Sequence, residues 1–156
     1  MEQTTSISKN MKKTVDIWTD GACSGNPGKG GWCSILIYNG TQKIISGNEQ
    51  LTTNNRMELM AVIQALNALR EPCIVNLHSD SAYIINAINN NWLEKWSKNG
   101  WINSKKQTVA NQELWEELIA HTKIHNIKFI KVAGHSQIEL NELCDKYARQ
   151  EIKKIN

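Results

Sequence analysis

The order of strand-like and helical patterns along the chain restricts its fold more than any other feature. Three runs rich in branched apolar residues come first, an amphipathic helical pattern follows, and helix and strand patterns then alternate. This order predicts one mixed sheet with helices on its faces, because parallel neighbours are joined by crossovers that lie against the sheet. With 156 residues, the α/β fold is expected to form one domain with a substantial core.

The expected elements are read from hydrophobic periodicity and from turn signals. Strands are predicted over 14–20, 31–40, 41–51, 73–79 and 127–132, and helices over 56–69, 81–88, 111–123 and 141–154. Asn39-Gly40 predicts a hairpin between the second and third strands. A short helix and a loop are expected between 89 and 108. Residues 1–12 are polar and aperiodic, so we expect a disordered tail followed by one domain over 13–156.

Composition excludes some classes of protein. The net charge is +3, too small to identify a polyanion partner by itself. The four cysteines form no Cys-x-x-Cys pair, which disfavours a zinc knuckle and predicts reduced, mostly buried thiols. No apolar run approaches the roughly 20 residues of a membrane helix, and the first residues lack a secretory signal. We therefore expect a cytoplasmic protein with no membrane partner.

The glycine-rich stretch over 25–31 resembles a phosphate-binding loop only superficially. Such a loop needs Gly, four residues, and then Gly-Lys followed by Ser or Thr. Here Lys29 is followed by Gly30, and no helical pattern comes next. A hairpin turn over 22–31 is the better interpretation.

Three carboxylates occupy positions that predict a shared site. Glu58 lies on the inward stripe that continues through Val62, whereas a surface glutamate would face outward. Asp20 and Asp80 each close a strand-like run, so two strand ends and one helix start could converge. Grouped carboxylates repel one another unless cations join them. The alternative is that Asn55 caps the helix, Glu58 completes a capping box, and both aspartates begin turns.

Two further residues are candidates for the same site. Asp145 lies at the margin of the buried face of the last helix, although it could instead form an exposed ion pair with Arg149. His135 follows the fifth strand, and a histidine side chain would suit proton transfer beside a metal site. Taken alone, it would be an ordinary loop histidine.

A set of motifs in fixed order closely resembles ribonuclease H of type 1. The resemblance covers about Thr14 to Arg149 and rests on Thr19-Asp20-Gly21, Thr53-Asn54-Asn55-Arg56-Met57-Glu58-Leu59, Ser79-Asp80-Ser81, Gly134-His135, and Asn141-Glu142 leading to Asp145. It implies a five-stranded mixed sheet in which the second strand is antiparallel to the rest. It also implies hydrolysis of the RNA strand of RNA/DNA hybrids, giving 5′-phosphate and 3′-hydroxyl ends.

By the same resemblance, two Mg²⁺ ions bind in the presence of substrate, and Mn²⁺ is a possible substitute. The implied metal ligands are Asp20, Glu58, Asp80 and Asp145, and His135 would move protons or assist product release. Oxygen ligands suit hard divalent cations, and a cation pair suits in-line phosphodiester displacement. No small-molecule cofactor is expected, and we expect a monomer.

The resemblance also nominates residues that contact nucleic acid. The loop after the first strand and the start of the first helix would face the RNA strand, which nominates Cys23, Ser24, Gly25, Asn26, Asn54 and Glu58. Asn26, Thr53 and Asn55 are further candidates for contacts with either backbone, although turn formation and helix capping are alternative roles. The 2′-hydroxyl is the chemical mark that would separate the RNA strand from the DNA strand.

The segment between 89 and 108 resembles the basic protrusion of the family. The residues nominated for hybrid binding are Trp92, Lys95, Trp96, Lys98, Lys105 and Lys106. Lysines would bind phosphates, whereas the tryptophans could either contact a DNA sugar or anchor the helix to the core. Glu94 reduces the local charge. Ala82 stands where many relatives have Gln, and Gln137 stands where a glycine is common, so affinity or turnover is expected to differ.

Two alternative functions remain open. One is another nuclease of the same superfamily, such as an integrase or an exonuclease. The other is a hybrid-binding module without catalysis, although four clustered acids would hinder polyanion binding unless metals were present.

Overall fold

The computed structural model describes residues 12–132 and 138–155, so most of the predicted tail lies outside the described residues. Five strands form one sheet: β1 (Lys13–Gly25), β2 (Gly28–Tyr38), β3 (Thr41–Thr52), β4 (Cys73–Ser79) and β5 (Asn126–Lys131). Five helices accompany them: α2 (Asn54–Asn67), α3 (Ala82–Asn89), α4 (Trp92–Asn99), α5 (Gln112–Ile124) and α6 (Ile138–Lys153). The order along the chain agrees with the sequence prediction.

The sheet has the predicted mixed topology. Its spatial order is β3-β2-β1-β4-β5. β2 pairs antiparallel with both of its neighbours, whereas β1–β4 and β4–β5 are parallel pairs. The second strand is therefore antiparallel to the rest, and β1 and β4 reach the same edge of the sheet with their carboxyl ends.

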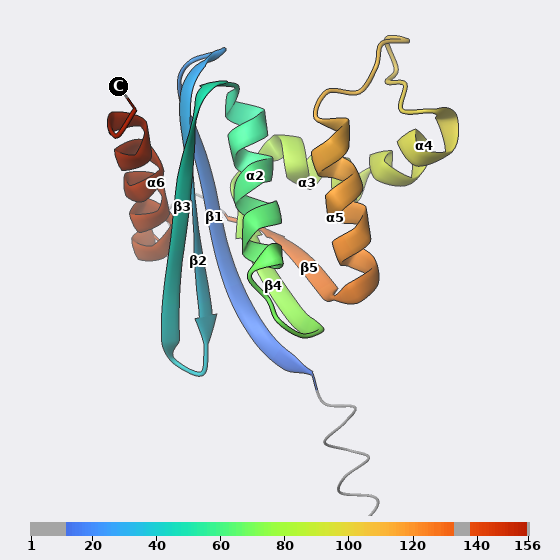
Figure 1. The fold of residues 1–156 in the computed structure, drawn as a ribbon. Coiled ribbons are helices and arrows are strands. Elements are labelled where there is room, and N and C mark those ends of the chain that lie inside the picture. The colour runs from blue at the N-terminus through green and yellow to red at the C-terminus, as the bar shows by residue number, and fades with distance from the viewer. Residues whose placement is uncertain (1–11, 133–137, 156) are drawn as a thin grey trace, which may run out of the picture.

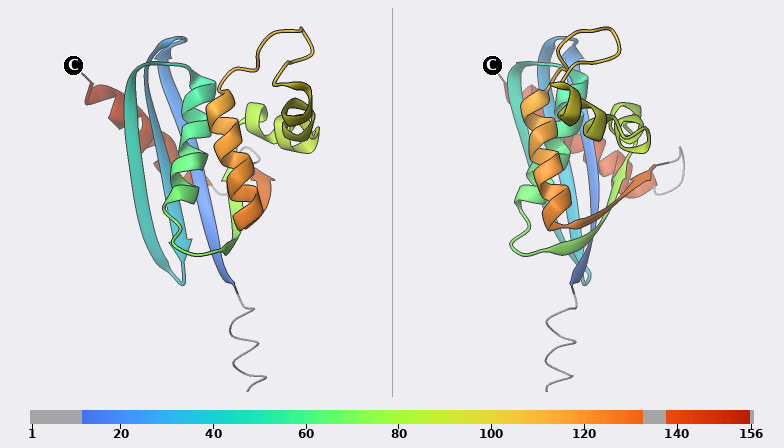
Figure 2. Two further views of the ribbon diagram at one scale, coloured as in Figure 1. Left: turned by 45° about the vertical axis from the view of Figure 1, so that its right-hand side comes forward. Right: turned by 90° about the vertical axis from the view of Figure 1, so that its right-hand side faces the viewer.

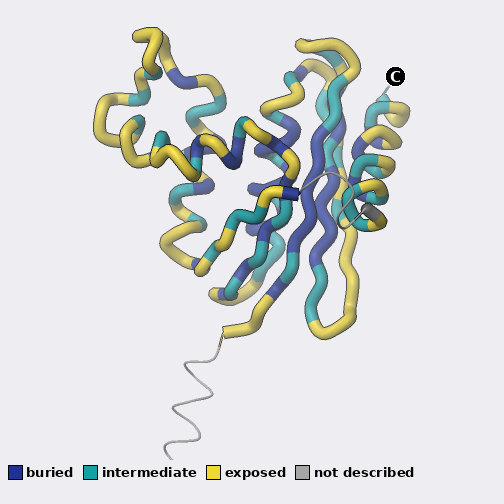
Figure 3. Tube along the Cα trace, turned by 180° about the vertical axis from the view of Figure 1, so that it is seen from behind, coloured by how far each residue is buried: buried dark blue, intermediate teal, exposed yellow. Residues whose placement is uncertain are grey.

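Helices cover both faces of the sheet (Figure 1). α2 packs on β1 and β2, and α5 packs against α2, while α6 lies on the opposite face against β1, β2 and β3. Each face has its own apolar cluster. The larger cluster centres on residues such as Ile17, Leu59 and Trp115, and the smaller one includes Trp18, Cys33 and Cys144. From behind, the central strands are buried while much of β3 is exposed (Figure 3).

The glycine-rich stretch differs in detail from its prediction as a broad turn over 22–31. β1 continues to Gly25 and β2 begins at Gly28, so the hairpin turn is confined to Asn26-Pro27. The second hairpin is as predicted, with both Asn39 (φ 50°) and Gly40 (φ 77°) at positive φ. This is the backbone conformation that an Asn-Gly turn adopts between antiparallel strands.

α4 and the loop after it project from the helical layer (Figure 2). Within this protrusion, residues 92–109, an antiparallel bridge between Ile102 and Thr108 closes the loop. Across residues 12–132 and 138–155, no helix is long and apolar enough to span a membrane. The four cysteines are free thiols, three of them buried and Cys23 partly exposed, as predicted.

Candidate active site

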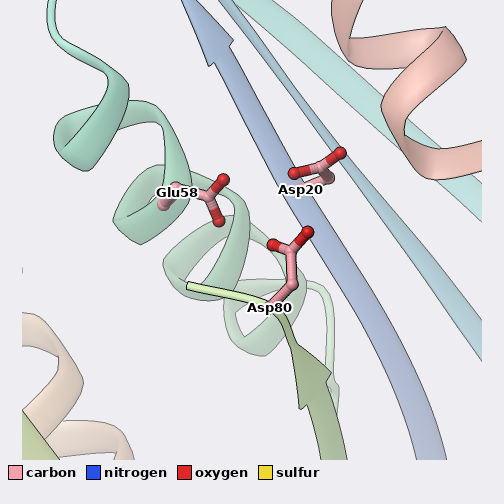
Figure 4. A group of neighbouring side chains, drawn as sticks. All are labelled: Asp20, Glu58 and Asp80. Carbon is pink, nitrogen blue, oxygen red and sulfur yellow. The ribbon is translucent and has the colours of Figure 1, made fainter. Parts of the chain in front are cut away.

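Three carboxylates converge where β1 and β4 meet the first turns of α2. Asp20 lies in β1, Glu58 in α2, and Asp80 directly follows β4 (Figure 4). One oxygen atom from each side chain lies within 4.8 Å of the other two. The convergence predicted from the two strand ends and the helix start is therefore present in the fold.

Gly21 allows this close approach between β1 and α2. A Cβ atom at Gly21 would overlap the backbone nitrogen of Glu58, so only glycine permits the contact. The Gly21 N–H donates to Asp20 Oδ1 at 2.9 Å and to Glu58 Oε1 at 3.2 Å. One backbone group thus holds one oxygen of each carboxylate.

Burial and mutual repulsion both favour the protonated forms of these acids. Asp20 is 6% exposed and Glu58 is 5% exposed. Burial, and next the charge of Asp80, raise the pKa of Asp20 to about 7. Burial also raises the pKa of Glu58 well above its ordinary value, followed by the charges of Asp20 and Asp80. The pKa of Asp80 is raised as well, mainly by burial. The group is therefore unstable when fully ionised and without a compensating positive charge.

An unpaired oxygen shows that the group suits a cation. Glu58 Oε2 is buried and has no hydrogen-bond partner among the described residues. Burying an unpartnered carboxylate oxygen is costly. A hard divalent cation bound by three carboxylates would satisfy this oxygen and remove the repulsion, so the donor set fits Mg²⁺ or Mn²⁺.

Asp145 lies at the margin of the group and is held differently. Its carboxylate is 40% exposed and forms an ion pair with Arg149 at 2.8 Å, which was the alternative considered for it. It nevertheless lines the same cleft as the three acids. Its charge also raises the pKa values of Asp20 and Asp80. Asp145 is thus close enough to act on the group electrostatically.

The carboxylates form the floor of an open cleft of about 500 Å³. Its walls include two of the nominated contact residues, Asn54 and Asn55, and also Ala82. The capping role proposed for Asn55 is wrong, because the N-cap of α2 is Thr53, whose side chain accepts from the Arg56 N–H at 3.2 Å. Asn54 and Asn55 occupy the first turn instead, where both side chains are exposed.

Tyr83 also lines the cleft, although no sequence motif singles it out. The Tyr83 hydroxyl oxygen accepts from Trp115 Nε1 at 3.1 Å and from Asn111 Nδ2 at 3.2 Å. Since both donors come from the region of α5, this contact depends on the fold. The available sequence signal was only its place in the first turn of the helix that follows Asp80.

The β1–β2 hairpin stands beside the helix start. Asn26 Oδ1 accepts from the Asn54 N–H at 3.2 Å, which ties the hairpin turn to α2. Cys23 Sγ contacts Thr52 O at 3.4 Å. Ser24 and Gly25 are exposed at the hairpin end, and neither lines the carboxylate cleft.

In the protrusion, the tryptophans form a chain that reaches the core. Trp96 lies 5.8 Å from Trp92, 6.2 Å from Trp101 and 5.8 Å from the fully buried Trp115, measured between ring centroids. The anchoring role proposed for Trp92 and Trp96 is therefore present. Both also line a second groove of about 520 Å³. Their packing and a binding role are compatible.

The four nominated lysines of the protrusion are all exposed. Lys95 and Lys105 line the second groove, whereas Lys98 Nζ pairs with Glu94 Oε1 at 2.9 Å. Lys106 lies in the loop at positive φ. His135 and Gln137 lie outside the described residues.

Comparisons with known proteins identify the family. The family model described as RNase H matches residues 12–153. Ribonuclease H from Caldanaerobacter subterraneus subsp. tengcongensis is 59% identical over 146 residues, which cover 94% of this chain and 95% of that protein. Ribonuclease H from Acetivibrio thermocellus is 60% identical over 144 residues, covering 92% and 97%.

Solved structures share the fold. LC9-RNase H1, a type 1 RNase H with the type 2 active-site motif, matches with a TM-score of 0.80 at 26% identity, covering 94% of this chain and 75% of that chain. LC11-RNase H1, solved in complex with RNA/DNA hybrid, matches with a TM-score of 0.70 at 22% identity, covering 90% and 97%. The predicted fold and enzyme class are thereby confirmed. This chain belongs to the ribonuclease H family.

Proposed function

We propose that this protein is an endonuclease that hydrolyses the RNA strand of RNA/DNA hybrids by a two-metal-ion mechanism, leaving 5′-phosphate and 3′-hydroxyl ends. The carboxylate group of Asp20, Glu58 and Asp80 is the observation that carries this proposal. The relatives named Ribonuclease H and the LC11-RNase H1 complex with RNA/DNA hybrid support the choice of substrate.

The metal ligands would be Asp20, Glu58, Asp80 and Asp145. Two bound Mg²⁺ or Mn²⁺ ions would supply charge stabilisation to the attacking water and to the leaving oxygen. The residues themselves have a separate task. Because the pKa of Asp20 is raised to about 7 and that of Glu58 is also raised, the pair must release bound protons before it can act as a ligand set. Activity should therefore rise with pH.

Strand discrimination is assigned to the helix start and the hairpin beside it. Asn54 and Asn55 present exposed amides at the cleft, where they could hydrogen-bond to 2′-hydroxyls. The Asn26–Asn54 contact would keep hairpin residues 23–26 next to the helix start, so that both segments could contact the RNA strand. Thr53 stays a candidate for a backbone contact, although its side chain already caps α2.

The protrusion would hold the DNA strand. Lys95 and Lys105 line a groove beside Trp92 and Trp96, which combines phosphate-binding charge with aromatic surface. Lys98 and Lys106 would add to the same positive surface. His135 stays a prediction as the residue that moves protons near the cleft. A catalytic domain over 13–156, a monomeric state, a cytoplasmic location and the lack of a small-molecule cofactor also stay predictions.

The test is a Mg²⁺-dependent cleavage assay on four substrates of matched sequence: RNA/DNA hybrid, double-stranded RNA, single-stranded RNA and duplex DNA. Asp20→Asn serves as the variant, and end analysis of the products identifies the phosphate and hydroxyl termini. We expect cleavage of the RNA strand in the hybrid alone and its loss in Asp20→Asn.

Other results would replace the proposal with a defined alternative. Hybrid binding without cleavage would identify a binding module. Cleavage of duplex DNA would place the protein with other nucleases of the superfamily. Wild-type cleavage rates in Asp20→Asn would refute the metal-site assignment.

A further inference from the structure

A stacked pair of rings lies on the sheet next to the carboxylate group. Trp18 of β1 and His78 of β4 are register partners, and their rings stack with centroids 3.9 Å apart and planes only 4° from parallel. Two residues further along each chain segment come Asp20 and Asp80. Because side chains alternate along a strand, residues two apart share a face about 7 Å from one another. Each ring of the pair therefore belongs to the residue two positions before one of the two aspartates.

Asp16 holds the imidazole in this orientation. Asp16 precedes Trp18 by two residues on the same strand, and its Oδ1 lies 3.7 Å from His78 Nε2. The His78 side chain is only 15% exposed, so it is held between the Trp18 ring and neighbouring atoms. A ring restrained in this way packs across the last register pair of β1 and β4, next to Asp20 and Asp80.

Trp18 also contacts the helix that carries the fourth acid. Trp18 is 4% exposed and belongs to the cluster that includes Cys144 and Ala148 of α6. The Cys144 thiol lies 3.6 Å from the Trp18 carbonyl oxygen and 3.1 Å from that of Cys33. Cys144 directly precedes Asp145, so the cluster that contains Trp18, Cys144 and Ala148 packs beside the part of α6 that carries Asp145.

One ring pair thus connects the three elements β1, β4 and α6, from which Asp20, Asp80 and Asp145 project. Carboxylates at such short separations repel one another, so a ligand set assembled before metal binding needs rigid support from behind. Flat stacked rings provide this support without competing for the cation, because the imidazole faces Trp18 and Asp16.

We propose that the Trp18–His78 stack is a positioning element that sets the affinity of the carboxylate group for its first divalent cation. The proposal rests on the proposed metal-dependent function and assigns no contact between either ring and the substrate. Residues that orient metal ligands typically change affinity about 10-fold to 100-fold when they are replaced.

The test compares His78→Ala with His78→Phe by calorimetric titration of Mn²⁺ alone, without nucleic acid. We expect His78→Ala to weaken Mn²⁺ binding about 10-fold. The Mg²⁺ concentration for half-maximal cleavage should rise by a similar factor, while kcat at saturating Mg²⁺ and KM for hybrid stay close to wild type. His78→Phe keeps a flat ring and should recover most of the affinity.

A second variant separates stacking from the polar contact with Asp16. His78→Gln keeps a polar side chain for Asp16 but has no ring, so it should lose affinity as His78→Ala does. It also provides the measurement if His78→Ala fails to fold. His121→Ala is the matched control, since His121 lies on α5 and hydrogen-bonds to Asn67 at 2.7 Å. Its affinity for Mn²⁺ should equal that of wild type.

The outcomes distinguish this inference from the function on which it rests. If folded His78→Ala and His78→Gln bind Mn²⁺ as wild type does while melting at a lower temperature, the stack is only structural and the inference is overturned. If wild type neither binds Mn²⁺ nor cleaves hybrid, the proposed function fails and the inference fails with it. Wild-type cleavage together with ring-dependent affinity supports both.

Discussion

The carboxylate cleft and the protrusion face the same proposed substrate but are built in opposite ways. In the cleft, Asp20 and Glu58 are nearly buried, and a backbone contact that only Gly21 allows fixes their positions. In the protrusion, the lysines are exposed, and the tryptophan chain connects this segment to the core. The carboxylates of the cleft are buried close together and repel one another when ionised, whereas the lysines of the protrusion are exposed to solvent.

This difference predicts which measured quantities should respond to changes in each region. A buried, mutually repelling group has large energies that depend on protons and cations. Exposed charges in water contribute little individually and are screened by salt. Changes in the cleft should therefore alter kcat and the pH dependence of stability, while changes in the protrusion should alter KM and its salt dependence.

The largest effect is expected from Glu58→Gln. This change removes one charge from the ligand set while nearly preserving its shape, so cleavage should fall by about 1000-fold or more, as expected when a group essential to metal catalysis is lost. Hybrid binding in EDTA should persist or tighten, because a negative charge near the polyanion is removed. Single-turnover cleavage and fluorescence anisotropy measure the two quantities.

Glu117→Gln is the control for the same chemical change. Glu117 is exposed on α5 and does not line the cleft, so its cleavage rate should match that of wild type. Weaker hybrid binding by Glu58→Gln in EDTA would contradict the view that the Glu58 carboxylate repels the polyanion in the absence of metal.

The next effect is a pH-dependent stability of the metal-free protein. The pKa of Asp20 is raised to about 7 and those of Glu58 and Asp80 are also raised, so the folded state binds more protons than the unfolded state between the ordinary and the raised pKa values. The contribution of these groups is then fully present at low pH and is lost as pH rises through 7. In EDTA, the free energy of unfolding should fall by roughly 1–3 kcal/mol between pH 5.5 and pH 8.5.

Asp20→Asn isolates this contribution from that of other titrating groups. The variant should be more stable than wild type at pH 8.5 in EDTA, and the difference should shrink at pH 5.5 and on addition of Mg²⁺ to the wild type. Urea unfolding at each pH measures it. A difference that is constant across this range would show that repulsion in the cleft is small.

The inward position of Glu58 could be predicted from the sequence, whereas the start of α2 could not, and both outcomes have physical causes. Glu58 could be predicted to face inward because helical periodicity fixes which residues share a face. The start of α2 could not, because Thr53, Asn54 and Asn55 are all good capping residues. Thr53 is the N-cap in the fold, and the next residue makes a tertiary contact, in which Asn26 Oδ1 accepts from the Asn54 N–H.

The predicted hairpin in the glycine-rich stretch is present, but its turn is shorter than predicted, for a related reason. Local propensity treats glycine as a turn residue, so the strands were predicted to stop early. In the fold, Gly21 meets the backbone of α2 and Gly31 meets that of α6, and a Cβ at either position would overlap the helix. These contacts lie far apart in sequence, as do those that hold Tyr83 at the cleft, so no local pattern could indicate them.

A moderate effect is expected in the protrusion from the double change Lys95→Ala and Lys105→Ala. Both lysines line the second groove, and their loss should raise KM for hybrid several-fold while kcat changes less than about twofold. The dependence of log affinity on log salt should become shallower by roughly 0.9 for each lost phosphate contact. Lys43→Ala with Lys153→Ala gives the same charge change on β3 and α6, and both of these lysines are exposed. If that control raises KM equally, binding reflects total charge rather than this groove.

The smallest effect, and the sharpest test of the contrast, is Glu94→Gln. Glu94 Oε1 holds Lys98 Nζ at 2.9 Å, and both side chains are largely exposed, so the pair should contribute almost nothing to stability. Removing Glu94 frees Lys98 and takes a negative charge away from the phosphates, so KM for hybrid should fall about twofold at low salt and converge with wild type at high salt. Glu71→Gln is the matched control, because it breaks an exposed ion pair with Lys13, 3.6 Å apart, on the body of the protein. A gain in affinity that persists at high salt would mean that the protrusion, like the cleft, acts through a structured contact rather than through exposed charge.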